Sequence, residues 1–435
     1  MKKCLPLSVS LFLLVVMGCL GEESSFAQQP LTWQEVRAKF EVMNPTLRTA
    51  RIGIDESRAQ QITAYLRPNP TFTGVLDQLH PNRVQLHPFN QNGALEDSIQ
   101  IASVTYLIER MNKRELRLES AQKGTAIVAS QLADLARSLL FTLRSAFIQV
   151  LQQKAILALA RENLSYYDRV LQVSSERFKA GDIAQIDLER LQLQRVTFES
   201  DVQNAEVSLR TGKIQLLTLL NERTPVEQFD VAGPFDFSEQ ILPLAEFRRV
   251  ALVTRPDLKA AMESIDQAKT NHQLAVANGS TDPTIGVDVG RFASTASPPP
   301  GTSPISYMGL SVSIPLRIFD RNQGEKLRTQ YDITRNERLR DATEALIYSD
   351  VDSAYATLNS TVTLLKPYKA QYLQQAVTVR DIVTFSYQRG GASLLDFLQA
   401  QNEYRSVQRS YLSLVGSFLS AAAQLNLAVG REVIP

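Results

Sequence analysis

The 435-residue sequence is poor in residue types on which several protein classes depend. Its two cysteines, Cys4 and Cys19, both lie close to the N-terminus. A structural disulfide is excluded, because Cys4 falls inside a segment typical of an export signal and at most one cysteine remains after its removal. The 46 basic residues balance 45 acidic ones, which leaves a formal net charge of +1. Nucleic-acid binders concentrate basic residues on one face, so we expect no nucleic-acid partner.

The sequence also lacks the short motifs of common enzymes. No glycine-rich loop precedes a Lys-Ser or Lys-Thr pair, so no nucleotide-driven step is indicated. Neither a Gly-x-Ser-x-Gly elbow nor a His-Glu-x-x-His metal pair occurs. The only histidines are His80, His87 and His272, and their spacing matches no metal-ligand motif. We therefore expect no enzymatic activity, no cofactor and no resident metal.

The N-terminus has the pattern of an export signal. Two lysines precede an apolar run over residues 7–17, which is too short to span a bilayer permanently. Two cleavage positions compete. A small-x-small site ending at Ala27 predicts a signal peptide over residues 1–27, whereas the residues just before Cys19 resemble a lipobox, in which Cys19 is acylated and becomes the first residue. No run of about 18 consecutive apolar residues follows, so no transmembrane helix is expected.

An internal duplication organises the rest of the sequence. The motif Asn44-Pro45-Thr46-Leu47 and the motif Arg255-Pro256-Asp257-Leu258 open similar helical stretches, with their prolines 211 positions apart. Gly181 and Gly390 stand in similar surroundings 209 positions apart. The two pairs of motifs occur in the same order and are separated by nearly the same number of positions, which indicates a tandem repeat.

The duplication predicts the domain boundaries. A first repeat covers residues 28–221, a linker covers 222–243, and a second repeat covers 244–435. Asp187 and Asp396 each lie six residues after the repeat glycine. We expect the two aspartates to occupy equivalent positions.

Each repeat should have the same plan of a helix, two strands and a long helical hairpin. Thr32 and Glu35 predict a capping box at the start of the first helix. Prolines predict that this helix ends near residue 67 and its counterpart near 282. Alternation of apolar with small or polar residues predicts strands at about 71–76, 98–108, 284–291 and 305–316.

Long helices fill the remaining sequence. Apolar residues recur every three or four positions along 397–425 without a break, and along 188–209 with one interruption at Arg195. Such a repeat favours left-handed supercoiling against neighbouring helices. Gly181 and Gly390 mark the hairpin tips, where each helix pair turns. A helix of about 60 residues is about 90 Å long, which suits the wall of a tube.

Four strands in one chain cannot close a barrel, and open sheet edges are not tolerated in lipid. A trimer would supply about twelve strands, enough to close. The predicted fold class is therefore mostly α with a small β part. Duplicated coiled-coil hairpins and four strands per chain would close as a trimeric 12-stranded transmembrane β-barrel with an α-helical periplasmic tunnel.

This plan resembles the TolC family of outer-membrane efflux proteins over essentially the whole mature chain. Residues 309–325, GLSVSIPLRIFDRNQGE, are similar to the strand-to-helix turn of the CzcC-like heavy-metal branch, and residues 109–114 form a looser first-repeat match. The resemblance implies a homotrimer in the lipid of the cell outer membrane, extending into the periplasm. It also implies a passive exit duct for small toxic solutes or metal cations, which docks on a periplasmic adaptor protein linked to an inner-membrane transporter.

The resemblance also implies site residues. Family members close the periplasmic end with inward-facing acidic residues just after the second tip; Asp396 matches the first of them, and Gln399 stands where a second acid is common. A ring of three carboxylates would repel itself and attract cations. The hairpin tips around Gly181, Asp187 and Gly390 would contact the adaptor.

Two other classes remain as alternatives. A periplasmic adaptor also carries a signal and long helical hairpins, but it should show one hairpin inside a β domain rather than a duplicated pattern. A structural coiled-coil protein would lack the alternating strand segments.

Overall fold

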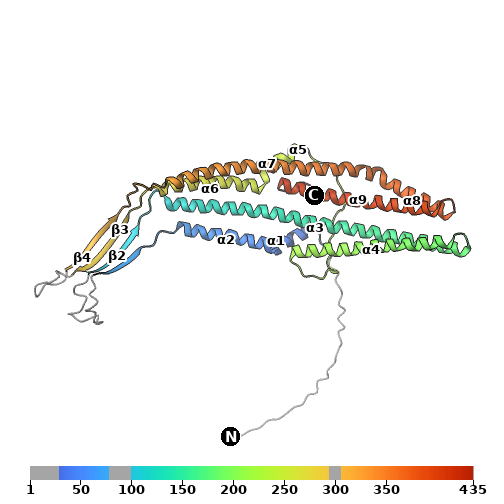
Figure 1. The fold of residues 1–435 in the computed structure, drawn as a ribbon, viewed down its shortest axis with the longest axis horizontal. Coiled ribbons are helices and arrows are strands. Elements are labelled where there is room, and N and C mark those ends of the chain that lie inside the picture. Colours follow the sequence, from blue (N-terminus) through green and yellow to red (C-terminus); the bar gives the residue numbers. More distant parts are fainter. Residues whose placement is uncertain (1–28, 78–98, 293–304, 435) are drawn as a thin grey trace, which may run out of the picture.

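The computed structural model describes residues 29–77, 99–292 and 305–434, and it is mostly helical with a small sheet at one end (Figure 1). The loops predicted to join the strand pairs, with His80 and His87, lie outside the described residues, as does the signal segment with Cys19. The strands are β1 (Thr71–Asp77), β2 (Ile99–Leu107), β3 (Thr284–Phe292) and β4 (Ile305–Ser313). The helices are α1 (Trp33–Met43), α2 (Pro45–Tyr65), α3 (Lys113–Ala180), α4 (Gln185–Leu220), α5 (Leu244–Thr254), α6 (Pro256–Asn278), α7 (Gln323–Pro367), the π-helical turn η2 (Tyr368–Tyr372), α8 (Leu373–Gln388) and α9 (Leu394–Val429).

The first helix of each repeat is divided into two. The capping box of Thr32 and Glu35 is confirmed at the start of α1. The single helix predicted from there to residue 67 is wrong, because α1 ends at Met43 and α2 begins at Pro45. A proline disfavours helical geometry at the residue before it, and Asn44 is extended, with φ −64° and ψ 121°. In the second repeat, α5 and α6 are divided in the same way before Pro256, and α6 ends at Asn278, short of the expected 282.

The four strands form one antiparallel sheet in the order β1-β2-β3-β4. Their bounds lie within two residues of the predicted ones, except that β4 ends at Ser313 and not at 316. Pro315 has no N–H to donate to a neighbouring strand. The hydrogen bonds between β3 and β4 therefore end before the alternating apolar pattern does. Both β1 and β4 are edge strands in the single chain.

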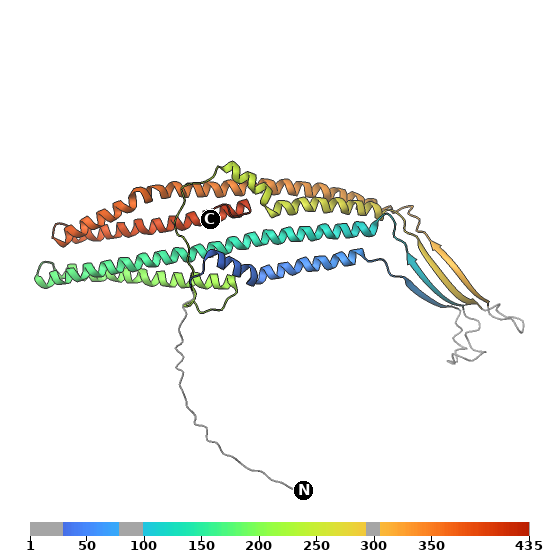
Figure 2. The same ribbon diagram turned by 180° about the vertical axis from the view of Figure 1, so that it is seen from behind.

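The helices continue the sheet as a single layer. Near the sheet, α2, α3, α6 and α7 lie side by side in the order of their strands, as the two opposite views show (Figures 1 and 2). Toward the far end the layer consists of two hairpins, α3–α4 and α8–α9, which meet where α3 packs on α9. One chain therefore forms a curved wall with two open edges, β1–α2 and β4–α7.

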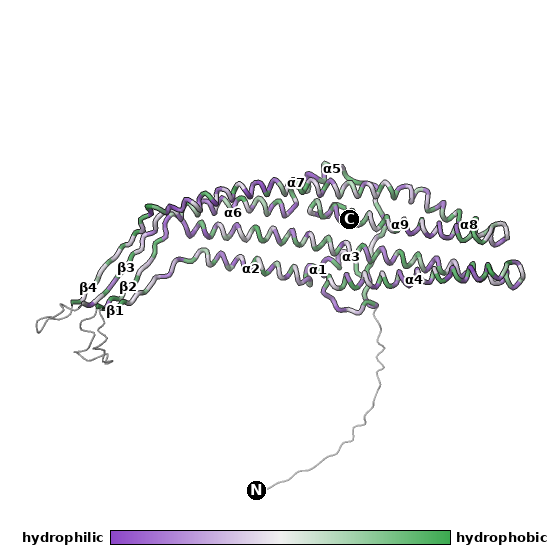
Figure 3. The backbone as a smooth tube through the Cα atoms, viewed as in Figure 1, coloured by the Kyte–Doolittle hydropathy of each residue, from purple (hydrophilic) through white to green (hydrophobic). Residues whose placement is uncertain are grey.

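The long helices differ between the repeats. Helix α3 has 68 residues and is about 100 Å long. Its second-repeat counterpart is interrupted, since Pro367 is followed by η2 before α8 begins. Proline lacks the N–H that the regular hydrogen bonding of an α-helix needs, and a π-helical turn accommodates the missing hydrogen bond. By length and composition alone, α3 and α9 could each cross a membrane, whereas the sequence analysis expected no transmembrane helix. Hydrophobic and hydrophilic residues nevertheless alternate along both helices (Figure 3).

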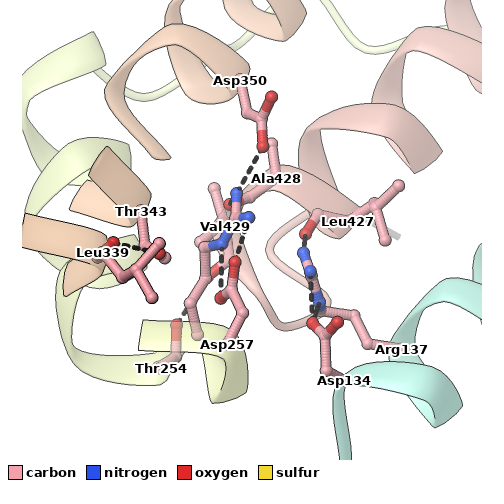
Figure 4. A network of polar contacts seen from close by, with 11 residues as sticks. Asp134, Arg137, Thr254, Asp257, Leu339, Thr343, Asp350, Leu427, Ala428 and Val429 are labelled. Carbon is pink, nitrogen blue, oxygen red and sulfur yellow. Dashed lines mark hydrogen bonds and ion pairs between the residues drawn. The ribbon is translucent and has the colours of Figure 1, made fainter. Parts of the chain in front are cut away.

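The duplicated motif caps the returning helix of each repeat. The last carbonyls of α9 accept hydrogen bonds from three side chains: Leu427 O from Arg137, Ala428 O from Arg255 at 3.2 Å, and Val429 O from Thr254 at 2.6 Å (Figure 4). The first-repeat counterpart of Arg255, Asn44, donates to Leu219 O of α4 at 3.2 Å. Helix C-termini leave carbonyls unsatisfied, so the motif fixes where each hairpin is anchored.

Arg255 is buried with two ion pairs. Its guanidinium lies 2.6 Å from a carboxylate oxygen of Asp257 and 2.8 Å from one of Asp350. Burial raises the pKa of Asp257, but the hydrogen bonds and the charge of Arg255 lower it more. The pKa of this carboxyl therefore lies below its ordinary value. A cation at the C-terminus of a long helix also complements the helix dipole.

Candidate channel wall and hairpin tips

The two faces of the sheet differ in polarity. Phe72, Val104, Val287 and Leu310 form one row across all four strands, and all four side chains are exposed. Side chains alternate between the faces of a strand, so the next row points the opposite way. That row consists of Thr73, Ser103, Asp288 and Gly309.

Burial shows how the sheet curves. Along β3, Val287 and Val289 are exposed, whereas Gly286 is buried and Asp288 is half-buried. Residues on the inside of a curved sheet are the more crowded ones. The row with Asp288 therefore lies on the concave side, which also carries Val75 and Ile101, and the row with Val287 lies on the convex side.

Glycines make room for side chains on the concave face. Gly290 pairs with Tyr307, and a Cβ added at Gly290 would overlap the tyrosine ring. A Cβ at Gly309 would lie 2.7 Å from Oδ2 of Asp288. The hydroxyl of Tyr307 is hydrogen-bonded to the Asp288 carboxylate. An aromatic ring across from a strand glycine stabilises the pair, so Tyr307 helps to order the concave side of the sheet.

Both hairpins turn at the predicted glycines. Gly181 has φ +87° and Gly390 has φ +78°, in the left-handed region that favours glycine. In the first tip, the Asp182 amide donates to Arg177 O at 2.8 Å; in the second, the Gly391 amide donates to Ser386 O at 2.8 Å. These bonds end the ascending helices in the usual way for a left-handed cap. The tips lie at the end of the molecule opposite the sheet (Figure 2).

The two predicted tip aspartates occupy the same helical position. Asp187 and Asp396 are each the third residue of the returning helix, in α4 and α9. A carboxylate in the first turn of a helix stabilises the exposed N–H groups there. Asp396 completes a capping box with Ser393: its Oδ2 accepts from the serine hydroxyl at 2.7 Å and from the serine amide at 3.1 Å. These two hydrogen bonds lower the pKa of Asp396.

The structure places Gln399 one turn after Asp396, on the exposed surface of α9. Its amide donates to Oε1 of Glu403 at 2.9 Å. The sequence analysis expected a second acid at the position of Gln399. The next acidic residue on α9 is Glu403, one turn later. Within the described residues, no group of three or more His, Cys, Asp or Glu is arranged to hold a metal ion.

Aromatic rings join the two hairpins above the tips. Tyr167 of α3 stacks on Phe198 of α4 with 4.5 Å between centroids, and Tyr387 of α8 stacks on Phe397 of α9 at 4.9 Å. Tyr167 and Phe397 bring the two stacks together at 6.4 Å. These four residues, which we call the tip cluster, are buried. Arg177 adds a hydrogen bond across the hairpins, to Tyr387 O at 2.9 Å.

A charged contact also crosses between the hairpins. Asp201 of α4 pairs with Arg405 of α9 through one carboxylate oxygen and with Arg409 through the other, at 2.7 Å. The guanidinium of Arg405 lies 4.3 Å from the ring centre of Phe198, so the ion pair sits directly on the tip cluster. Charged groups held this closely and shielded from water interact more strongly than an exposed pair.

A second arginine lies between rings of both hairpins. Arg380 of α8 is 4.1 Å from the ring centre of Tyr404 and 4.6 Å from that of Tyr166 on α3. Sequence reasoning missed both arginines. The one available signal concerned Arg405, which follows Tyr404 of the apolar seam in α9.

These features define a class of protein: a mostly helical chain in which a small curved sheet with an apolar, exposed row continues into a long layer of helices. Comparison with known proteins agrees with this class. The family model described as "Outer membrane efflux protein" matches residues 248–431. In this region the chain is similar to outer-membrane efflux channels, and its place is the outer membrane.

Individual relatives cover nearly the whole chain. The cobalt-zinc-cadmium resistance protein CzcC of Cupriavidus metallidurans is 23% identical over 93% of this chain and 91% of its own length. The outer membrane protein TolC of Escherichia coli is 24% identical over 99% of this chain and 87% of its own. Among solved structures, CusC superposes with a TM-score of 0.72 at 16% identity, covering 94% of this chain and 96% of that one. That structural likeness shows the shared fold.

Proposed function

We propose that three copies of the chain assemble into a closed duct, with a 12-stranded barrel in the outer membrane and a helical tunnel in the periplasm. The observation that carries this proposal is the sheet, whose convex side has an apolar, exposed row across all four strands, while the neighbouring row on the concave side consists of Thr73, Ser103, Asp288 and Gly309. Lipid outside and water inside require that arrangement, and the open edges β1 and β4 require partners. The repeat division at 28–221 and 244–435 belongs to this proposal.

The duct acts as the passive exit of a tripartite efflux system. The hairpin tips, with Gly181, Asp187 and Gly390, dock on a periplasmic adaptor, through which an inner-membrane transporter supplies the energy. The exposed position of both tips at the far end of a helix about 100 Å long supports this role. Because cargo only passes through, the duct needs no catalytic group.

We infer that the cargo is a metal cation. The support is the turn at 309–325 and the coverage of a relative named for cobalt, zinc and cadmium resistance. Small toxic organic solutes are the second candidate, since a duct need not bind what it carries.

Asp396 and Gln399 form the constriction in this proposal, with three Asp396 carboxylates around the axis. The capping box gives Asp396 a structural role as well, so charge and helix stability must be separated in any test. The signal over residues 1–27, or acylation at Cys19, directs the chain to the outer membrane.

The cargo is tested with a strain that lacks this chain. Growth is measured against Co²⁺, Zn²⁺ and Cd²⁺ and, in parallel, against a cationic dye and a detergent. We expect sensitivity to the metals that is reversed by the wild-type chain. Sensitivity to the dye and detergent alone would replace metal cations by organic solutes as the cargo, and unchanged growth in every condition would contradict the efflux role.

A further inference from the structure

Both edge helices carry a row of residues on the side turned away from the neighbouring helix of their own chain. On α2, Ser57 and Gln61 contact Thr125 of α3, at 2.9 and 2.6 Å. The side of α2 away from α3 carries a second row with alternating three- and four-residue spacing. It consists of Ile52, Asp55, Ala59 and Ile62, and Leu66 continues it at the C-cap of the helix.

Helix α7 has a matching row. Asn322, just before α7, donates to Ala275 O at 2.8 Å, and Thr329 is hydrogen-bonded to His272 at 2.9 Å, so this side packs on α6. The opposite side carries Leu327, Tyr331, Thr334 and Arg338. Such spacing is that of a coiled-coil seam, which needs a partner helix.

The sheet-proximal ends of the two rows are apolar and exposed. The side chains of Ile62 and Leu66 on one edge, and of Leu327 and Tyr331 on the other, are between 55 and 69% exposed. Phe319, in the segment between β4 and α7, is 89% exposed. Exposed apolar residues grouped at one level of a structure mark an interaction surface.

The seam inside the chain at the same level is different in kind. There, Lys113 at the start of α3 is 3% exposed and forms an ion pair of 2.6 Å with Asp282, which follows α6. Lys113 also donates to Ser280 O, and the Arg110 amide donates to Asp282. The chain thus joins its own two repeats by buried charge and leaves apolar rows at its outer edges.

We propose that Ile62 and Leu66 of one copy pack against Phe319, Leu327 and Tyr331 of the adjacent copy, as the apolar seam that joins subunits at the junction of barrel and tunnel. This inference rests on the proposed trimer and names the surface that forms it. The occupant is a second copy because the two rows lie on the two terminal elements of one continuous layer. If β4 pairs with β1 of the next copy in antiparallel fashion, the residues after β4 meet those before β1.

The test is disulfide cross-linking in the assembled, membrane-extracted protein. Ile62→Cys is combined in turn with cysteine at each position from 327 to 331, and covalent oligomers are scored on non-reducing gels beside native mass spectrometry. A disulfide needs Cβ atoms about 4 Å apart, so yield should follow the α-helical period and be greatest at 327 and 331. The matched control is Ile62→Cys with Val276→Cys: Val276 is exposed on α6, at the same end but inside the layer, and should give no cross-link.

The outcomes separate the seam from the duct. Covalent trimers with the helical period support the seam. A native trimer without cross-links at any of the five positions overturns the seam and leaves the proposed duct standing. A parent protein that is not a trimer overturns both.

Discussion

Asp201 and Arg405 are 204 residues apart in sequence, yet their ion pair connects the first hairpin to the second beside the tip cluster. Both side chains are largely shielded from water, at 18 and 10% exposure. A contact between hairpins must break if the second hairpin moves relative to the first. The pair is therefore placed to hold the periplasmic end in the arrangement seen here.

We expect Asp201→Asn to favour the open duct. Loss of a charged hydrogen bond of this kind costs about 2 kcal/mol, which shifts an open–closed equilibrium by about thirtyfold if the contact is absent in the open state. The measurement is open probability in planar bilayers. Arg161→Gln is the matched control, because Arg161 pairs with Glu206 inside the first hairpin and is more exposed. An equal change in both variants would contradict a role for contact between the hairpins.

The charge of Asp396 can be separated from its capping role. Ser393→Ala removes the same capping box but keeps the carboxylate, at a cost of about 1 kcal/mol in helix stability. Asp396→Ala removes both. If a carboxylate ring selects cations, Asp396→Ala should lower the cation preference in reversal-potential measurements, and Ser393→Ala should preserve it. Equal loss in the two variants would leave Asp396 a purely structural residue.

The buried pair of Arg255 and Asp257 predicts a pH dependence. The pKa of Asp257 in the folded chain lies below its ordinary value. Its contribution to stability is therefore complete above the unfolded pKa and is lost as pH falls through the folded one. Thermal unfolding measured over a range of pH should show that stability falls less steeply toward acid pH in Asp257→Asn than in the wild type. Asp55→Asn, which affects an exposed pair with Arg58, should keep the wild-type profile; an unchanged pH dependence in Asp257→Asn would refute the assignment.

Glycine at the second tip is required by backbone geometry. Gly390→Ala should destabilise the tip by about 1–2 kcal/mol, because φ +78° is costly for a residue with a Cβ even though the surrounding space is open. Gly324 in α7 also has open space but ordinary helical geometry, so Gly324→Ala should be neutral or stabilising. Hydrogen exchange at the tip amides distinguishes the two, and equal protection in both variants would contradict the argument.

Local signals made much of the fold predictable. Alternation marks the strands, and the tip glycines meet a requirement for positive φ that few other residues satisfy. The predicted heptad rows are also largely buried, for example Leu191 and Phe198 in α4 and Phe397 and Phe418 in α9. Each of these patterns is contained within a short stretch of chain.

Features that depend on tertiary packing were missed. The sequence shows Asp201 and Arg405 as ordinary helix residues, because their pairing depends on how two distant helices rotate against each other. Likewise, Asn44 and Arg255 appear as cap residues of their own helices, but their contacts with Leu219 and Ala428 require the returning hairpin to end beside them. The early end of β4 depends on one proline at an edge strand.

The central claim is that this chain forms a trimeric duct, and single-channel recording in a planar bilayer tests it most directly, with the mass of the same detergent-extracted sample measured alongside. The account predicts a trimer that gives small, cation-preferring openings, which increase in the Asp201→Asn variant. A monomer without conductance would contradict the closed barrel and favour a periplasmic adaptor.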